Sequence, residues 1–381
     1  MSGLKIVADE NIPALEHYFS PLGTVHTYAG RSLSRRDVED ADVLLVRSVT
    51  SVNSDLLAGS AVRFVGSTTI GVDHLDTHYM DSHSIVWRNA PGSNARSVVE
   101  YMISVFCALQ LLDPLLKAQK RVGIIGMGMV GGSLYQQLSA LGIQCRGYDP
   151  LISPDRWPVM TDLSSVLDCD VICLHTPLTN DGPAPSHHLI DATVLERLKP
   201  GSVLINAGRG AVVDNAALLA RLQRDNCVMA VLDVWENEPK INVRLLDKLA
   251  IVTPHIAGYS YDGKLAGTRQ LAQACRQWLG VDALADAGGG TREPLSLDRP
   301  PSGTTADQIS QCVLAAYNVM HDDRRMRNLV GSTEIGSAFD CLRKHYPRRR
   351  EFAHYRVEDS DVTSDTADYL SRLGFSLGTN Q

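Results

Sequence analysis

The sequence predicts an α/β protein with two doubly wound parallel-sheet domains and a small C-terminal α/β domain. Two observations lead to this fold class. Short apolar runs alternate with helix-patterned segments over residues 1–93 and again over 121–256, which is typical of parallel sheets covered by helices. Around residues 281–305 the composition shifts to Gly, Pro and Ser, as in a linker, and a further short α/β pattern follows.

The first series contains predicted strands at residues 4–8, 43–46, 63–66 and 85–87, and predicted helices at 12–19 and 34–39. Polar residues follow these strands, among them Arg47, Ser48, Thr69 and Gly71. Ligands of open α/β sheets bind at the carboxyl ends of the strands, so we expect these loops to be candidates for substrate binding. Solvated loops with capping residues have the same composition, and each loop taken alone fits that interpretation as well.

A long helix is predicted over residues 95–112, between the two series. Ser97 and Glu100 have the spacing of a capping box, which marks a helix start. Pro114 is expected to end or kink this helix, because proline lacks a backbone donor and crowds the preceding turn.

Residues 121–149 hold the most informative local pattern. It consists of a strand at 122–125, the turn Gly126-x-Gly128-x-x-Gly131, a helix to about 141, a strand at 144–148 and then Asp149. The glycines permit a tight turn, close approach to a pyrophosphate and close packing of helix on strand. An acid at this place accepts hydrogen bonds from a ribose 2′-OH and repels a 2′-phosphate, so the pattern predicts NAD as cofactor. Glycines that serve packing alone are the alternative.

Three chemically useful residues follow later predicted strands. Arg209 follows the strand at 203–206, Glu238 the strand at 229–234, and His255 a third apolar stretch. Oxidation of a 2-hydroxy acid needs these groups: an imidazole that removes the hydroxyl proton, a carboxylate that orients it, and a guanidinium that holds the substrate carboxylate. Each residue alone is more often structural, but all three are expected at the edge where the cofactor binds.

The C-terminal segment has helical patterns near 305–320 and 337–346 and possible strands at 352–357 and 374–377. At this size, a face that dimerises is the expected role. The segment also contains a run of basic residues followed by several acids; the basic residues are Arg343, Lys344, His345, Arg348, Arg349 and Arg350. A solvated surface, an anion site and a charge-matched interface are open interpretations of this charge pattern. In the second of these, Arg348, Arg349 or Arg350 reaches the substrate phosphate.

Composition excludes several classes. A net charge of −7 over 381 residues gives no reason to expect nucleic acid or an anionic membrane as partner. The 8 cysteines are scattered, with no C-x-x-C pair, so disulfides and structural zinc are not expected and no metal is predicted. The N-terminal stretch is too short and charged for a signal peptide, and no apolar window is long enough to span a bilayer. We expect a soluble, cytoplasmic protein.

The turn at Gly126, the Arg209-Gly210 segment, Asp233-Val-Trp-x-x-Glu238-Pro239 and Pro254-His255-Ile-Ala-Gly258 together resemble the D-isomer-specific 2-hydroxyacid dehydrogenases over residues 1 to about 283. The resemblance implies that Arg209, Glu238 and His255 are catalytic and that Asp233 contacts the nicotinamide carboxamide. The further cofactor-binding residues that it implies are Gly126, Gly128, Met129, Val130, Gly131, Asp149, Thr176, Ala207, Gly208, Arg209 and Gly258.

Within that family, the loops after residues 8 and 46 and the segment Leu342-Arg-Lys-His-Tyr346 are similar to members that oxidise a phosphorylated four-carbon 2-hydroxy acid and carry a C-terminal dimerisation domain. This resemblance implies substrate contacts by Ser48, Thr69 and Tyr259, backbone N–H groups near Gly71 that hold the carboxylate, and Arg47 near the phosphate. Two alternatives stay open: a dehydrogenase of another phosphorylated 2-hydroxy acid such as 3-phosphoglycerate, and a non-catalytic NAD-sensing protein.

These inferences give the expected domain organisation. Residues 1–93 with 257–283 form a discontinuous substrate-binding domain, and residues 94–256 form a Rossmann NAD-binding domain. Residues 284–305 are the linker, and residues 306–381 form the C-terminal dimerisation domain, so a homodimer is expected.

Overall fold

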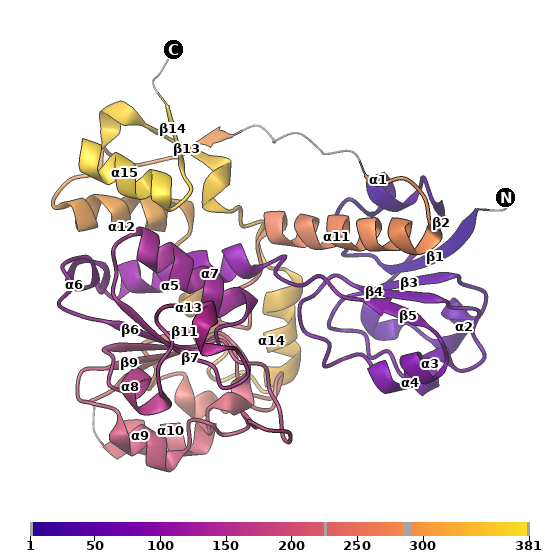
Figure 1. Cartoon of the computed structure of the whole chain (residues 1–381), viewed down its shortest axis with the longest axis horizontal. Helices are drawn as coiled ribbons and strands as arrows, with labels where there is room; N and C mark the ends of the chain where they lie inside the picture. The colour runs from indigo at the N-terminus through magenta and orange to yellow at the C-terminus, as the bar shows by residue number, and fades with distance from the viewer. Residues whose placement is uncertain (1–2, 225–226, 285–291, 379–381) are drawn as a thin grey trace. The chain divides into compact units, whose positions relative to one another are not determined.

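The computed structural model describes residues 3–224, 227–284 and 292–378. The chain forms two compact units (Figure 1). The first unit comprises Met1–Asn94 and Ser260–Gly289, and the second comprises Ala95–Tyr259 and Gly290–Gln381. The predicted fold class is confirmed, because both units contain a parallel sheet flanked by helices.

The first unit has a five-stranded parallel sheet in the order β2-β1-β3-β4-β5. Its strands are β1 (Leu4–Asp9), β2 (Gly23–Tyr28), β3 (Val43–Val46), β4 (Phe64–Ser67) and β5 (Val86–Arg88). The short helices are α1 (Leu15–Phe19), α2 (Arg35–Val38), α3 (Ser54–Leu57) and α4 (Thr77–Ser82). Helix α11 (Tyr261–Leu279) completes the unit, and its Leu271, Ala272 and Cys275 belong to the same core as Phe64.

The second unit has a six-stranded parallel sheet in the order β11-β10-β9-β8-β6-β7. The strands are β6 (Val122–Ile125), β7 (Cys145–Tyr148), β8 (Val171–Leu174), β9 (Val203–Asn206), β10 (Met229–Leu232) and β11 (Ile251–Val252). The strand order reverses beside β6, which is where doubly wound sheets bind ligands. Ile124 packs into one core and Ile125 into another, so the sheet is buried on both faces.

Helices cover both faces of this sheet (Figure 1). They are α5 (Ala95–Ala108), α6 (Leu112–Leu116), α7 (Met129–Ala140), α8 (Leu163–Leu167), α9 (Ala192–Arg197) and α10 (Asn215–Arg224). Residues of α5 and α7 belong to one core, and residues of α8, α9 and α10 belong to the other. The central strands are therefore shielded from water, and polar groups of this sheet are presented at its ends.

Two predictions about the long helix are wrong. Ser97 and Glu100 do not form a capping box, because the helix begins at Ala95 and both side chains are buried inside it. Ser97 Oγ donates to Glu351 Oε1, and Glu100 Oε1 accepts the Phe352 N–H. Pro114 does not end the helix either. That helix already ends at Ala108, ahead of the left-handed Gln110, and Pro114 lies inside α6.

The C-terminal segment contributes a three-stranded parallel sheet, β12-β13-β14. Its strands are β12 (Glu293–Pro294), β13 (Tyr355–Glu358) and β14 (Ser376–Gly378), and its helices are α12 (Thr305–Ala316), α13 (Val319–Arg327), α14 (Ile335–Lys344) and α15 (Ser364–Arg372). Strand β12 lies within the predicted linker, of which residues 285–291 lie outside the described residues.

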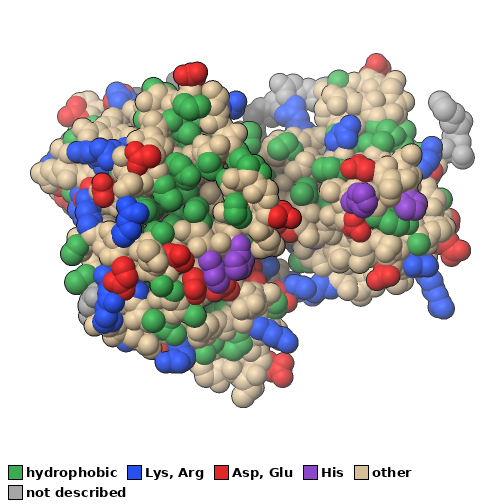
Figure 2. All heavy atoms as spheres, turned by 60° about the horizontal axis from the view of Figure 1, so that its bottom comes forward, with side chains coloured by type: hydrophobic (Ala, Val, Ile, Leu, Met, Phe, Trp, Pro, Cys, Tyr) green, Lys and Arg blue, Asp and Glu red, His purple; other side chains and the backbone are tan. Residues whose placement is uncertain are grey.

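The C-terminal segment packs closely against the Rossmann part of its unit. Ser104 Oγ on α5 donates to the Tyr317 carbonyl and accepts the Val319 N–H. Asp323 on α13 accepts the Val252 N–H of β11. Figure 2 shows basic and acidic side chains of the described residues interspersed on one face of the molecule.

Candidate active site

His255 and Glu238 form the centre of the candidate site. His255 Nδ1 lies 2.7 Å from Glu238 Oε2, and both side chains are half-buried. Glu238 Oε1 accepts the Trp235 N–H over 2.8 Å, so both carboxylate oxygens are held. Burial alone would raise the pKa of Glu238, but His255, the Trp235 N–H and the Arg343 guanidinium together lower it below its ordinary value. The glutamate is thus an ionised partner that fixes the imidazole.

Asp233 holds the loop that carries His255. Its side chain is 1% exposed and accepts hydrogen bonds from Thr253 Oγ1 and the Ile256 N–H through Oδ1 and from the Ala257 N–H through Oδ2. The His255 backbone is left-handed, with φ of 57°, and its N–H donates to the Asp233 carbonyl. The predicted contact of Asp233 with nicotinamide stays a prediction.

Arg209 lies in the loop after β9, next to the loop that carries Glu238. Asn206, fully buried at the end of β9, accepts the Gly208 N–H and donates to the Arg209 carbonyl, which fixes this turn. A Cβ on Gly210 would lie 1.9 Å from the Trp235 carbonyl oxygen, so the two loops touch through backbone. The fold thus brings Arg209 to the same sheet edge as Glu238 and His255.

The glycine turn has the geometry expected for a dinucleotide. Gly126 has φ of 89°, and a Cβ on Gly131 would lie 1.9 Å from the Gly126 carbonyl oxygen, so helix and strand pack as closely as predicted. A Cβ on Gly128 would meet no atom within 4 Å, which leaves open space in front of the helix. No side chain caps the start of α7 in the described structure, so Met129 and Val130 present backbone N–H groups there.

Asp149 and Thr176 border the same turn. Asp149 Oδ2 accepts the Met127 N–H over 2.9 Å, and Oδ1 accepts the Leu151 N–H over 3.0 Å. Thr176 Oγ1 is buried without a hydrogen-bond partner among the described residues. A Cβ on Gly208 would lie 3.0 Å from the Thr176 carbonyl oxygen, so Ala207, Gly208 and Thr176 are neighbours. A bound NAD fits three of these features: the Thr176 hydroxyl without a partner, the N–H groups at the start of α7, and the open space at Gly128.

His175, which follows β8 directly, was not predicted to be a site residue. Both ring nitrogens are buried without partners in the described structure, and burial lowers the pKa of His175 to about 4. The imidazole is therefore neutral at physiological pH.

Tyr259 has a partner that was not predicted. Arg343 Nη2 of α14 donates to Tyr259 Oη over 3.0 Å. The neighbouring Gly258 is half-buried on the same loop. Arg343 belongs to the basic run of the tail, and no local pattern distinguishes it from the other basic residues as the partner of Tyr259.

The interpretation of Arg349 as a solvated surface residue is wrong. Arg349 is 7% exposed, donates to the carbonyls of Ala257 and Ser97, and stacks over the Tyr317 ring with 3.8 Å to the centroid. These contacts connect the tail to the loop after His255, so Arg349 is not a surface residue, and its contact with a phosphate stays a prediction. Arg348 is exposed and Arg350 is half-buried, and their contact with a phosphate stays a prediction.

The predicted substrate loops lie in the first unit. Arg47 Nε lies 3.0 Å from the buried Asp9 carboxylate. Thr69 Oγ1 lies 2.8 Å from Ser67 Oγ and donates to the carbonyl of Gly71. Ser48 is exposed at the end of β3. These side chains gather at the carboxyl ends of β3 and β4, which is the edge where ligands bind.

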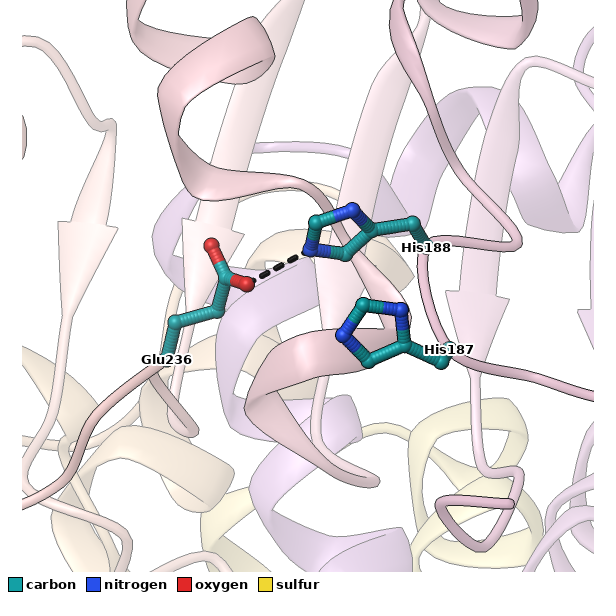
Figure 3. Close-up of side chains that lie close together, drawn as sticks. All are labelled: His187, His188 and Glu236. Carbon is teal, nitrogen blue, oxygen red and sulfur yellow. Dashed lines mark hydrogen bonds and ion pairs between the residues drawn. The ribbon is translucent and has the colours of Figure 1, made fainter. Parts of the chain in front are cut away.

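One group of His, Cys, Asp and Glu side chains in the described structure is close enough to resemble a metal site: His187, His188 and Glu236, with ligand atoms within 4.8 Å of one another. Figure 3 shows that His188 Nε2 is already hydrogen-bonded to Glu236 Oε1, over 2.7 Å. Glu236 Oε2 also accepts the Asn215 N–H. This group joins the loop after β8 to the loop that carries Glu238.

Among the described residues, no helix is both long and apolar enough to cross a bilayer.

Residues 112–257 match the family model described as "D-isomer specific 2-hydroxyacid dehydrogenase, NAD binding domain", and residues 295–374 match a domain of unknown function. The site and the fold thus define a D-isomer-specific 2-hydroxyacid dehydrogenase with NAD as cofactor.

The chain is 48% identical to an erythronate-4-phosphate dehydrogenase of Cellvibrio japonicus, covering 98% of this chain and 99% of that one. It is 42% identical to the protein of the same name from Teredinibacter turnerae, again over 98% and 99%. The chain belongs to the erythronate-4-phosphate dehydrogenase family.

Solved structures show the same fold at lower identity. The D-lactate dehydrogenase from Aquifex aeolicus, complexed with NAD and lactic acid, is 22% identical, with a TM-score of 0.62 over 72% of this chain and 96% of that one. The 3-phosphoglycerate dehydrogenase of Entamoeba histolytica is 21% identical, with a TM-score of 0.59 over 73% and 96%.

Proposed function

We propose that the protein oxidises 4-phospho-D-erythronate at C2 to 2-oxo-3-hydroxy-4-phosphobutanoate, as a step of pyridoxal 5′-phosphate biosynthesis in the cytoplasm. The observation that carries the chemistry is the 2.7 Å contact between His255 Nδ1 and Glu238 Oε2, at the sheet edge that also holds Arg209. The choice of substrate is supported by the full-length similarity to proteins named for it.

The proposed mechanism assigns one task to each residue. Glu238 accepts a hydrogen bond from the Nδ1–H group of His255, which leaves Nε2 without a proton. Nε2 is therefore the atom that takes the proton of the C2 hydroxyl. Arg209 holds the substrate carboxylate and polarises the developing carbonyl. The glycine turn at Gly126–Gly131 would hold NAD, which would supply the acceptor for the hydride that leaves C2. Asp149 sets the preference for NAD because its carboxylate accepts a hydrogen bond from the ribose 2′-OH and would repel a 2′-phosphate.

In this proposal the first unit is the substrate-binding domain, with Arg47, Ser48, Thr69 and the backbone near Gly71 as substrate contacts, together with Tyr259 of the second unit. The C-terminal segment, residues 306–381, dimerises two chains. The dimer is testable by sedimentation: a mass twice the 41.5 kDa of the chain supports it, and a monomer contradicts it.

The function is tested by NADH formation from a panel of acids. We expect 4-phospho-D-erythronate to give the highest kcat/KM and D-erythronate and D-lactate to be poor. A higher value for 3-phosphoglycerate would favour the alternative substrate. An absence of turnover with every acid, while NAD still binds, would favour an NAD-sensing protein.

A further inference from the structure

Arg343 is a half-buried arginine beside the proposed catalytic pair, and its Nε has no hydrogen-bond partner within the described structure. It lies in the last turn of α14. Phe339 of this helix is fully buried, in the core that also contains Ile125 and residues of α8, α9 and α10. Leu342 packs partly against the same core, and Arg343, one residue further, faces Tyr259 instead. The core contacts of α14 thus fix where the guanidinium lies.

The position of Arg343 relative to His255 follows from two contacts. Its Nη2 donates to Tyr259 Oη, and its Cζ lies 5.6 Å from the centroid of the Tyr259 ring. Tyr259 is four residues after His255 on one loop, and the charges of Arg343 and Glu238 act on each other's pKa. The guanidinium is therefore a neighbour of the residues that bind and deprotonate the substrate.

The contacts around Arg343 leave part of its hydrogen-bonding capacity unused. Burial lowers the pKa of Arg343, but Tyr259, Glu238 and Asp340 together raise it, so its charge is partly compensated. Its Nε is nevertheless buried with no hydrogen-bond partner among the described residues. A half-buried guanidinium with unused donors is costly unless an anion completes it.

We propose that Arg343 binds the phosphate of the substrate. This inference rests on the proposed function and adds the residue that would select the phosphorylated acid. With Arg209 on the carboxylate and Arg343 on the phosphate, the two anionic ends of the substrate have separate cations, and C2 is held at His255. The hydroxyl of Tyr259 orients the guanidinium and leaves its remaining donors for the phosphate oxygens.

The test compares two substrates that differ only in the phosphate, 4-phospho-D-erythronate and D-erythronate. In Arg343→Met we expect kcat/KM for the phosphorylated acid to fall about 100-fold, because charge-assisted hydrogen bonds are lost, and that for D-erythronate to change less than about 3-fold. Lys344→Met, which removes the adjacent exposed cation, should change neither value. Equal losses on both substrates, or none on either, would overturn the proposal.

A second variant and a second ligand keep the test decisive. If Arg343→Met does not fold, Arg343→Lys, which keeps the charge, should lose activity on the phosphorylated acid alone, and an equal loss on both acids contradicts the proposal. If the wild type does not oxidise 4-phospho-D-erythronate, the proposed function fails separately. Calorimetry with inorganic phosphate and the NAD-loaded protein then decides: weaker binding by Arg343→Met supports the site, and equal or absent binding in both proteins overturns it.

Discussion

The buried carboxylate of Asp233 holds the loop that carries His255. The Asp233 carbonyl accepts the His255 N–H over 2.7 Å, and its side chain accepts the two N–H groups that follow His255. The Tyr101 hydroxyl lies 2.9 Å from Thr253 Oγ1, which in turn donates to Asp233. The orientation of the imidazole therefore depends on a carboxylate that is itself inaccessible to water.

This relationship predicts the effect of Asp233→Asn. The amide has one acceptor oxygen in place of two, so at least one of the buried donors loses its partner. We expect the free energy of unfolding to fall by about 2 kcal/mol and turnover to decrease. Urea denaturation measures the first effect, with the exposed Asp298→Asn as a control that should change little. Unchanged stability would mean that the network is unimportant to the fold.

His255→Ala tests the proposed base. Turnover should fall by about three orders of magnitude, because a positioned general base is removed. Binding of NAD, measured by fluorescence titration, should stay close to that of the wild type, since His255 lies outside the glycine turn. Loss of cofactor affinity together with activity would identify the histidine as structural.

Asp149→Ala tests the proposed preference for NAD. The variant should bind NAD more weakly and NADP more tightly than the wild type does, because its carboxylate no longer accepts from the ribose or repels a 2′-phosphate. The affinity for NAD should also reflect the lost hydrogen bond to the Met127 N–H at the glycine turn. If the ratio of the two affinities did not change, the ribose assignment would be wrong.

The neutral His175 predicts a pH dependence of stability. Burial lowers its pKa to about 4, whereas an unfolded histidine titrates near 6.5. Unfolding therefore takes up a proton between these values, so this contribution to stability is complete above pH 6.5 and is lost as the pH falls toward 4. His175→Leu should lose less stability than the wild type over that window, and the exposed His321→Gln should behave as the wild type does.

The sequence predicts the two larger sheets well because most of their strands are continuous apolar runs. Val43–Val46 and Val203–Asn206 are buried throughout and coincide with the predicted strands. Strand β2 was missed because only some of its residues are inward-facing, and His26 and two threonines interrupt the apolar pattern. The capping box at Ser97 was wrong since tertiary partners, Glu351 and Phe352, satisfy both residues.

The site residues that directly follow strands were predictable from the sequence. Arg209, Glu238 and His255 each follow a strand, so their convergence follows from the parallel order of the sheet. The contact of Arg343 with Tyr259 was not predictable, because α14 reaches Tyr259 only through the packing of Phe339 in a core formed mainly by distant residues. The burial of Arg349 was not predictable for the same reason, because it depends on Tyr317 and Ala257, which no local sequence pattern connects to it.

The central claim is that His255, Glu238 and Arg209 oxidise the substrate at C2. The most direct measurement uses 4-phospho-D-erythronate deuterated at C2 and follows the label by mass spectrometry. The account predicts that the deuterium appears in NADH and that the product is an unlabelled 2-oxo acid. Unlabelled NADH, or a product that retains the deuterium, would contradict it.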